Sequence, residues 1–219
     1  MPNPTNRVPS IPTRFLLAAM VVWASSSVQA QLTTSNLVRY QVLQRDPGTM
    51  AATYSDSGSC RSGTSRIQFR LQNQTSNTTV GSIEWKDLEG VTISGTRWKG
   101  RIGGLPVGGE YKAQLRALDG SGNVTDNSSL VENLLVGDVW LCAGQSNMMG
   151  EPGTTLNTAK VHTRILWSAQ PGTKETAGWG TTLAKGPSTS FGNRLAALTE
   201  IPVGIIYAAQ GGTSLHDWF

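Results

Sequence analysis

The chain has 219 residues, enough for one or two domains, and its hydrophobic content of 38% suffices for a core. The low charged fraction of 15% and the 25 glycines favour strands and loops over long helices, especially in the first half of the chain. The net charge is +4, but Lys and Arg are scattered without a basic stripe, which argues against a nucleic-acid partner.

Residues 1–30 have the pattern of a secretory signal peptide. Arg7 and Arg14 precede the apolar stretch Phe15–Ala24, and Ala30 offers a small residue at a cleavage position. Because the apolar stretch is shorter than the roughly 20 residues that span a bilayer, we expect no membrane span after cleavage. The sequence predicts a secreted, periplasmic or extracellular protein, and the alternative is an uncleaved signal anchor.

Residues 31–136 read as short strands separated by turns. Apolar and polar residues alternate in Arg66–Asn73 and in Gly109–Leu118, which is the period of a half-buried strand. Clusters of Gly, Pro and Asn separate such segments. This spacing predicts an N-terminal β-sandwich of immunoglobulin-like type over residues 31–136.

The pattern changes in residues 137–219, where buried strands alternate with a helix. Leu134–Gly144 is almost continuously apolar, as a strand of a parallel sheet must be when both of its faces are covered. Pro202–Ala209 is a second such strand, and Glu151–Pro187 is predicted to be a surface excursion. We therefore expect an α/β fold here, with an incomplete parallel sheet.

The helix of this unit is predicted over Ser188–Glu200. Ser188 or Ser190 is expected to cap its first turn. Phe191, Leu195 and Leu198 recur at helical spacing and are expected to share the face that packs on the sheet.

The cysteine content excludes little but gives no sign of a metal. Cys60 and Cys142 are the two cysteines of the chain, and whether they pair stays open. Neither cysteine has further Cys or His residues at the spacing that a zinc site needs. No metal and no cofactor is therefore expected.

Two glycine-bearing turns follow the two buried strands. Ser146 comes directly after the first strand, with Gly144 before it to permit a sharp bend, and Gly211–Gly212 follows the second. Reactive groups gather at the carboxyl ends of the strands of such sheets. From the residues alone Ser146 is either a nucleophile or an ordinary helix cap.

Residues 134–219 resemble a known family. The stretches GDVWLCAGQSNMMG and PVGIIYAAQGGTSLHDW, with SFGNRLA between them, look like the sialate O-acetylesterase type of carbohydrate esterase within the SGNH hydrolase superfamily. The resemblance implies a partial SGNH or flavodoxin-like sheet in residues 137–219. It also implies that Ser146 attacks an acetyl ester on a carbohydrate, and that the amides of Ser146 and Gly212, or Gly211, hold the oxyanion.

Further roles are implied by the same resemblance. Gln145 and Asn147 would orient the turn, and Trp218 would flank the sugar. The family's later blocks, of the types Gly-Glu-x-Asp and Asp-x-x-His, do not occur before Phe219. His162 reads as a partly exposed polar residue, and His216 does not stand where the family places its base. We therefore expect a truncated esterase that is inactive or weak as it stands.

Two alternatives remain beside the carbohydrate O-acetylesterase. One is a non-catalytic carbohydrate-binding or adhesion module built on the sandwich, and the other is a lipase-like serine hydrolase. The expected partner is an O-acetylated carbohydrate, while the particular sugar and the oligomeric state stay open.

Overall fold

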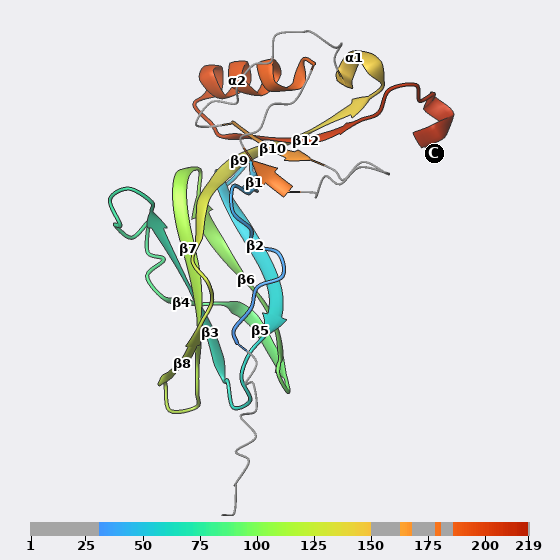
Figure 1. Cartoon of the computed structure of the whole chain (residues 1–219). Coiled ribbons are helices and arrows are strands. Elements are labelled where there is room, and N and C mark those ends of the chain that lie inside the picture. Colours follow the sequence, from blue (N-terminus) through green and yellow to red (C-terminus); the bar gives the residue numbers. More distant parts are fainter. Residues whose placement is uncertain (1–30, 150–162, 168–177, 181–185, 219) are drawn as a thin grey trace, which may run out of the picture.

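The computed structural model describes residues 31–149, 163–167, 178–180 and 186–218 (Figure 1). The predicted signal peptide and most of the predicted excursion Glu151–Pro187 lie outside these residues. For Thr163–Trp167 the prediction of a surface excursion is wrong, because this segment is a sheet strand in which Thr163 and Arg164 are buried. In the described part no helix is both long and apolar enough to cross a membrane. The elements are β1 (Val42–Asp46), β2 (Ala51–Ser59), β3 (Arg66–Asn73), β4 (Lys86–Asp87), β5 (Glu89–Ser94), β6 (Arg97–Pro106), β7 (Gly108–Leu118), β8 (Val124–Asn127), β9 (Val131–Gly144), α1 (Ser146–Met149), β10 (Thr163–Trp167), β11 (Gly178–Gly180), α2 (Ser188–Thr199), β12 (Val203–Ala209) and the 3₁₀ turn η1 (Leu215–Trp218).

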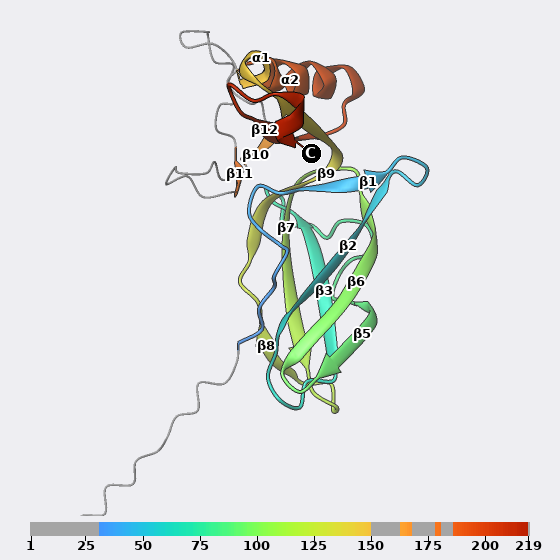
Figure 2. The ribbon, with the colours of Figure 1, turned by 90° about the vertical axis from the view of Figure 1, so that its right-hand side faces the viewer.

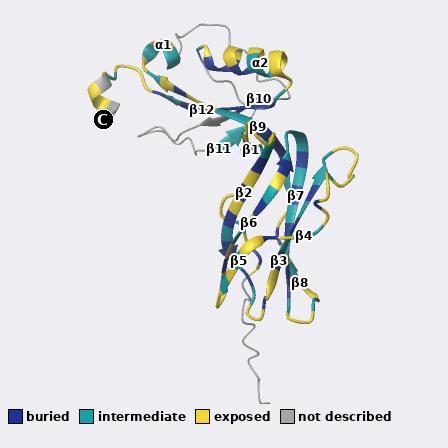
Figure 3. Ribbon diagram, turned by 180° about the vertical axis from the view of Figure 1, so that it is seen from behind, coloured by how far each residue is buried: buried dark blue, intermediate teal, exposed yellow. Residues whose placement is uncertain are grey.

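Strands β1 to β9 curl around one hydrophobic core. Antiparallel β2, β6 and β5 form one side, and antiparallel β3, β7 and β8 form the other (Figure 2). The inward-facing residues alternate with exposed ones, as the period-2 patterns predict, so that Phe69 and Leu115 pair across β3 and β7 with both side chains buried (Figure 3). Short β4 pairs with β3 and leads directly to β5, which nearly closes the curl.

The long strand β9 belongs to both halves of the molecule. Its first part pairs with β7 and, in parallel, with β1. Its second part pairs in parallel with β12, from Asp138 opposite Val203 to Gly144 opposite Ala209, and β12 pairs in parallel with β10. The two apolar runs of the sequence are therefore parallel neighbours. The domain boundary predicted between residues 136 and 137 falls inside this strand and stays a prediction.

The predicted fold class is wrong. The described residues are mostly strand, and their strands join into one mixed sheet that is nearly closed like a barrel in its first part. This is neither an α/β flavodoxin-like fold nor a free-standing immunoglobulin-like sandwich. Strand β9 pairs with β1 in the first part of the sheet and with β12 in the second, so the two regions that the sequence predicted as separate domains share one sheet. A flavodoxin-like sheet also needs helices on both faces, whereas the described α2 covers one.

Helix α2 packs on the sheet with only part of the face that the sequence predicted. Leu195 packs against the sheet cluster as expected, whereas Phe191 and Leu198 are 41% and 63% exposed. The fully buried residues of the helix are small, among them Gly192, where an added Cβ would lie only 2.9 Å from the Thr163 side chain. Close approach to the sheet therefore selects the small face. The expected serine cap is also wrong, since Pro187 occupies the N-cap position and makes no side-chain cap hydrogen bond.

A buried ion pair joins the two halves of the molecule. Arg164 on β10 is 1% exposed and pairs with Glu110 on β7. Burial lowers the pKa of the Arg164 guanidinium, and the neighbouring Glu110 carboxylate opposes that shift. Cys60 and Cys142 are free thiols buried in separate clusters, one in each half.

Candidate active site

Ser146 lies at the carboxyl end of β9, at the first position of α1. The bend before it needs glycine, because Gly144 has φ +150° and an added Cβ would lie 3.2 Å from Cβ of Met148. The Met149 amide donates to the Gln145 carbonyl at 2.9 Å and closes the short helical turn. The local sequence therefore turns the chain sharply and places the serine at the top of the strand.

The second glycine-bearing turn lies directly beside the first. The amide of Gln210 donates to the Gly144 carbonyl at 3.0 Å, which extends the β9–β12 pairing by one bond. The Gly211 amide donates to the sulfur of Met149 at 3.2 Å. These contacts bring together the serine turn and the glycine turn, which are more than sixty residues apart in the sequence. The juxtaposition of the two turns follows from the register of two parallel strands.

Tyr207 fixes the end of α1 from below. Its hydroxyl donates to the Met149 carbonyl at 3.0 Å. Burial raises the pKa of Tyr207, so that the hydroxyl stays protonated and remains a donor near neutral pH. Neither Met149 nor Tyr207 was singled out from the sequence. In the sequence, Tyr207 interrupts the apolar run of β12. A buried tyrosine hydroxyl needs a hydrogen-bond partner, so this residue could have indicated such a contact.

Ser146 is partly exposed, and among the described residues its hydroxyl has one weak partner. Its Oγ donates to Oε1 of Gln145 at 3.4 Å. Within the described part of the chain, no imidazole or carboxylate contacts this hydroxyl. His216 lies exposed in η1, and His162 is outside the described residues.

The glycine amides differ in their availability. The Gly211 amide is engaged by the Met149 sulfur. Gly212 is exposed, has φ +76°, and its amide has no acceptor among the residues described. The amide of Ser146 opens α1, where helix geometry leaves it without an intrahelical acceptor. Within the described residues, the amides of Ser146 and Gly212 are therefore donors without an acceptor at the two turns.

The turn after β12 is stabilised by hydrogen bonds to the Asp217 carboxylate. Asp217 Oδ2 accepts from the amide of Ser214 at 2.6 Å and from its hydroxyl at 2.9 Å. These two hydrogen bonds, the backbone one first, lower the pKa of the Asp217 carboxyl. Asp217 is therefore engaged in supporting the turn, a role that the sequence did not indicate.

The remaining predicted residues are placed unevenly. Gln145 contacts the serine as described above, whereas Asn147 is exposed and makes no side-chain hydrogen bond to a described residue. Trp218 ends η1, and its side chain is outside the described part. Groups of three or more His, Cys, Asp or Glu side chains that could hold a metal ion are absent from the described residues.

Comparison with known proteins gives the class of this segment. Residues 136–219 match the family described as carbohydrate esterase, sialic acid-specific acetylesterase. At the level of the family, this segment is similar to carbohydrate esterases. The resemblance to the sialate O-acetylesterase type is thereby confirmed for this part of the chain, which is less than half of its length. No curated protein matches the chain significantly.

Proposed function

We propose that the protein is a serine esterase that removes O-acetyl groups from carbohydrates, with Ser146 as the nucleophile. The observation that supports this most directly is the hydrogen bond between Gln210 and Gly144, which sets the Gly212 turn beside the serine turn. The family match of residues 136–219 supports the same reaction class. The lipase-like alternative has no comparable support.

The proposed reaction is an acyl transfer in two steps. Oγ of Ser146 attacks the acetyl carbonyl, and the carbonyl oxygen becomes an oxyanion held by the amides of Ser146 and Gly212. Collapse expels the sugar oxygen, which takes a proton and leaves as the free hydroxyl. Water then attacks the acetyl-serine, releases acetate and restores the serine hydroxyl.

Selection of Gly212 over Gly211 rests on hydrogen bonding. The Met149 sulfur already accepts the Gly211 amide. A donor that is engaged elsewhere cannot stabilise a developing charge without breaking its existing bond. We therefore assign the second oxyanion donor to Gly212 and a supporting role to Gly211 and Met149.

Removal of the serine proton limits the rate of this centre. A hydroxyl is a weak nucleophile near neutral pH unless a base takes its proton. Among the described residues none contacts Ser146 as a base. Enzymes deprived of one member of such a triad keep roughly a thousandfold to ten-thousandfold acceleration over water. We expect weak esterase activity that rises when a base is supplied from solution.

The test supplies that base. The protein is incubated with para-nitrophenyl acetate and increasing imidazole, and acetylation of each serine peptide is followed by mass spectrometry. We expect acetyl-Ser146 to form faster than acetyl-Ser121, an exposed loop serine that serves as the internal control. The Ser146→Ala variant should lose the fast acetylation, and Ser121→Ala should keep it. Equal acetylation of both peptides would refute the nucleophile.

A further inference from the structure

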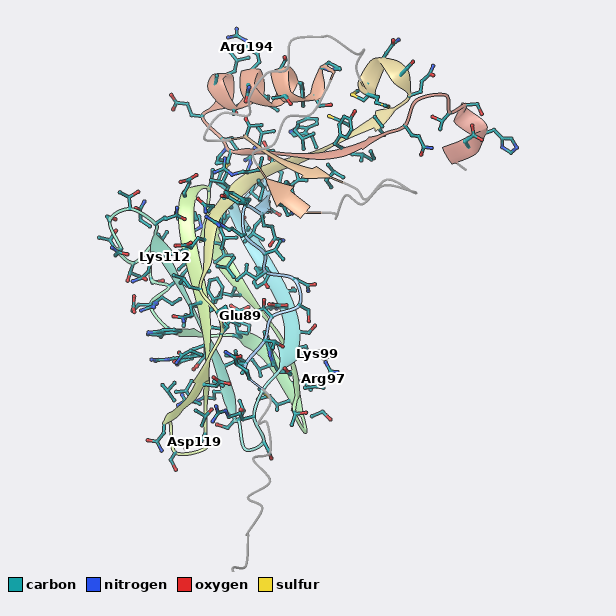
Figure 4. The ribbon with its side chains drawn as sticks, in the orientation of Figure 1. Glu89, Arg97, Lys99, Lys112, Asp119 and Arg194 are labelled. Atoms are coloured by element: carbon teal, nitrogen blue, oxygen red, sulfur yellow. The ribbon has the colours of Figure 1, made fainter. Side chains whose placement is uncertain are left out.

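A concave surface lies away from Ser146, on β2, β5 and β6 of the barrel. It is a shallow groove of about 260 Å³, and its polar lining includes Ser35, Ser57, Thr92, Ser94, Arg97 and Lys99. Its residues Arg97 and Lys99 lie toward the end of the barrel away from α1 (Figure 4). Nothing in the proposed esterase reaction uses it.

Strand register arranges the groove in two rows. In the first row Lys99 on β6 stands between Ser57 on β2 and Thr92 on β5. Ser35 extends this row, because its amide donates to the Ser57 carbonyl at 2.9 Å. The row therefore reads hydroxyl, hydroxyl, cation, hydroxyl across the sheet.

The second row repeats the arrangement one step along the strands. Arg97 stands between Ser59 and Ser94. Thr33 and Ser59 share a hydrogen bond of 2.9 Å between their hydroxyl groups. Since strand residues two apart are roughly 6.5 Å from each other, the two cations can contact one small anion together.

A buried carboxylate fixes the outer wall of the groove. Oδ1 of Asp56 accepts from the amides of Ser35 and Asn36, each at 3.0 Å. Asp56 is 5% exposed and also accepts from the Tyr54 hydroxyl. The segment that carries Ser35 is thereby held against β2, so the wall is preformed.

The two cations of the groove have no acidic partner in the described residues. The next residue on the same face of β6, Arg101, pairs with Glu89 at 3.5 Å. Arg97 and Lys99 are exposed and form no such pair (Figure 4). An uncompensated double positive charge surrounded by hydroxyl groups favours an anion that also carries hydroxyl groups.

We propose that this groove binds the carboxylate-bearing sugar of an acidic glycan. The carboxylate is placed between the guanidinium of Arg97 and the ammonium of Lys99, and the hydroxyl rows bond the sugar hydroxyls. Trp98 also lines the groove, but it is only 2% exposed and its indole donates to the Thr33 carbonyl, so its ring face is covered and cannot stack on a nucleic-acid base. The groove acts as a substrate anchor remote from the esterase centre, and its binding does not depend on Ser146.

The test is a titration of the whole chain with three sugars: sialyllactose, lactose and a glucuronic acid disaccharide. We expect at least one acidic sugar to bind tenfold or more tightly than lactose, with an affinity that falls as salt is added. Binding of the first sugar alone identifies a sialic acid glycan, and binding of the last alone identifies a uronic acid glycan. Equal binding of lactose, or no binding of either acidic sugar, overturns the proposal.

Matched variants locate the binding. Arg97→Gln with Lys99→Gln should weaken the acidic sugar at least tenfold. Lys112→Gln, which changes a partly exposed lysine on the other side of the barrel (Figure 4), should change it less than twofold. Thermal unfolding checks that both variants stay folded. An unchanged affinity in the double variant contradicts the assignment, and Ser146→Ala should have no effect, which separates this result from the esterase test.

Discussion

Replacing Glu110 with Gln should destabilise the protein by about 2–3 kcal/mol. The Arg164 side chain is 2% exposed and the Glu110 side chain 29% exposed. Breaking a fully buried pair costs about 3–5 kcal/mol, because one charge is left uncompensated. Partial exposure of Glu110 lets water take over some of the lost interaction, which reduces the expected cost to about 2–3 kcal/mol.

A double-mutant cycle separates the ion pair from general damage. Urea unfolding of Glu110→Gln, Arg164→Met and the double variant gives the three free energies of unfolding. The double variant should be more stable than the sum of the single changes by at least about 1 kcal/mol, because it leaves no buried charge behind. Additivity within about 0.5 kcal/mol would refute the claim that this pair links β10 to the barrel.

Two further predictions concern the site itself. Gly144→Ala should cost about 1–3 kcal/mol in thermal unfolding, because φ is +150° and the added Cβ meets Met148, and an unchanged midpoint would contradict the bend. For Asp217 the folded pKa is lowered by Ser214, so the stability it gives the turn is present above the unfolded pKa of about 3.9 and is lost as pH falls through the lower folded value. Ser214→Ala removes the hydroxyl donor and keeps the backbone amide donor, so NMR titration should show the Asp217 pKa rising part of the way toward its unfolded value, and an unmoved pKa would show that the hydroxyl hydrogen bond is absent.

Local features of the fold were predictable because neighbouring residues determine them. The alternation of Ile67, Phe69 and Leu71 with polar residues is reproduced as buried and partly exposed positions along β3. The apolar runs that became β9 and β12 are parallel neighbours. In each case the pattern reports burial directly, and burial is what selects the strand face.

Connections between strands were not predictable from these patterns. Strand β9 extends from Val131 to Gly144 and changes partners along its length, from β7 and β1 to β12. The spacing of apolar residues indicates that a strand is buried, but it does not indicate which strand it pairs with. The predictions of a separate sandwich and of an α/β fold class rested on such spacing, and both were wrong.

The prediction of which face of α2 packs on the sheet was inaccurate for a different physical reason. The apolar spacing of Phe191, Leu195 and Leu198 favoured one face, but of these only Leu195 packs against the sheet cluster, and the closest approach to the sheet is at Gly192. Phe191 lies at the margin of the contact, where it meets Trp140 of β9 edge-on with ring centroids 5.5 Å apart and stays 41% exposed. A glycine that permits close packing outweighs a side chain that could bury more area at a greater distance.

For the candidate site, the sequence predicted the position of the serine turn and of the glycine turn but not what holds them together. The contacts through Met149 and Tyr207 depend on strand register and on side-chain reach. A general base near Ser146 was not predicted from the sequence, and none contacts it in the described residues. The catalytic roles of the predicted residues stay predictions.

The most direct test of the acyl-transfer centre is a crystal structure of the protein after reaction with a methyl fluorophosphonate. We predict a phosphonyl group on Oγ of Ser146, with its oxygen 2.7–3.1 Å from the amides of Ser146 and Gly212. A phosphonyl oxygen that points into solvent, or an adduct on another serine, would contradict the assignment.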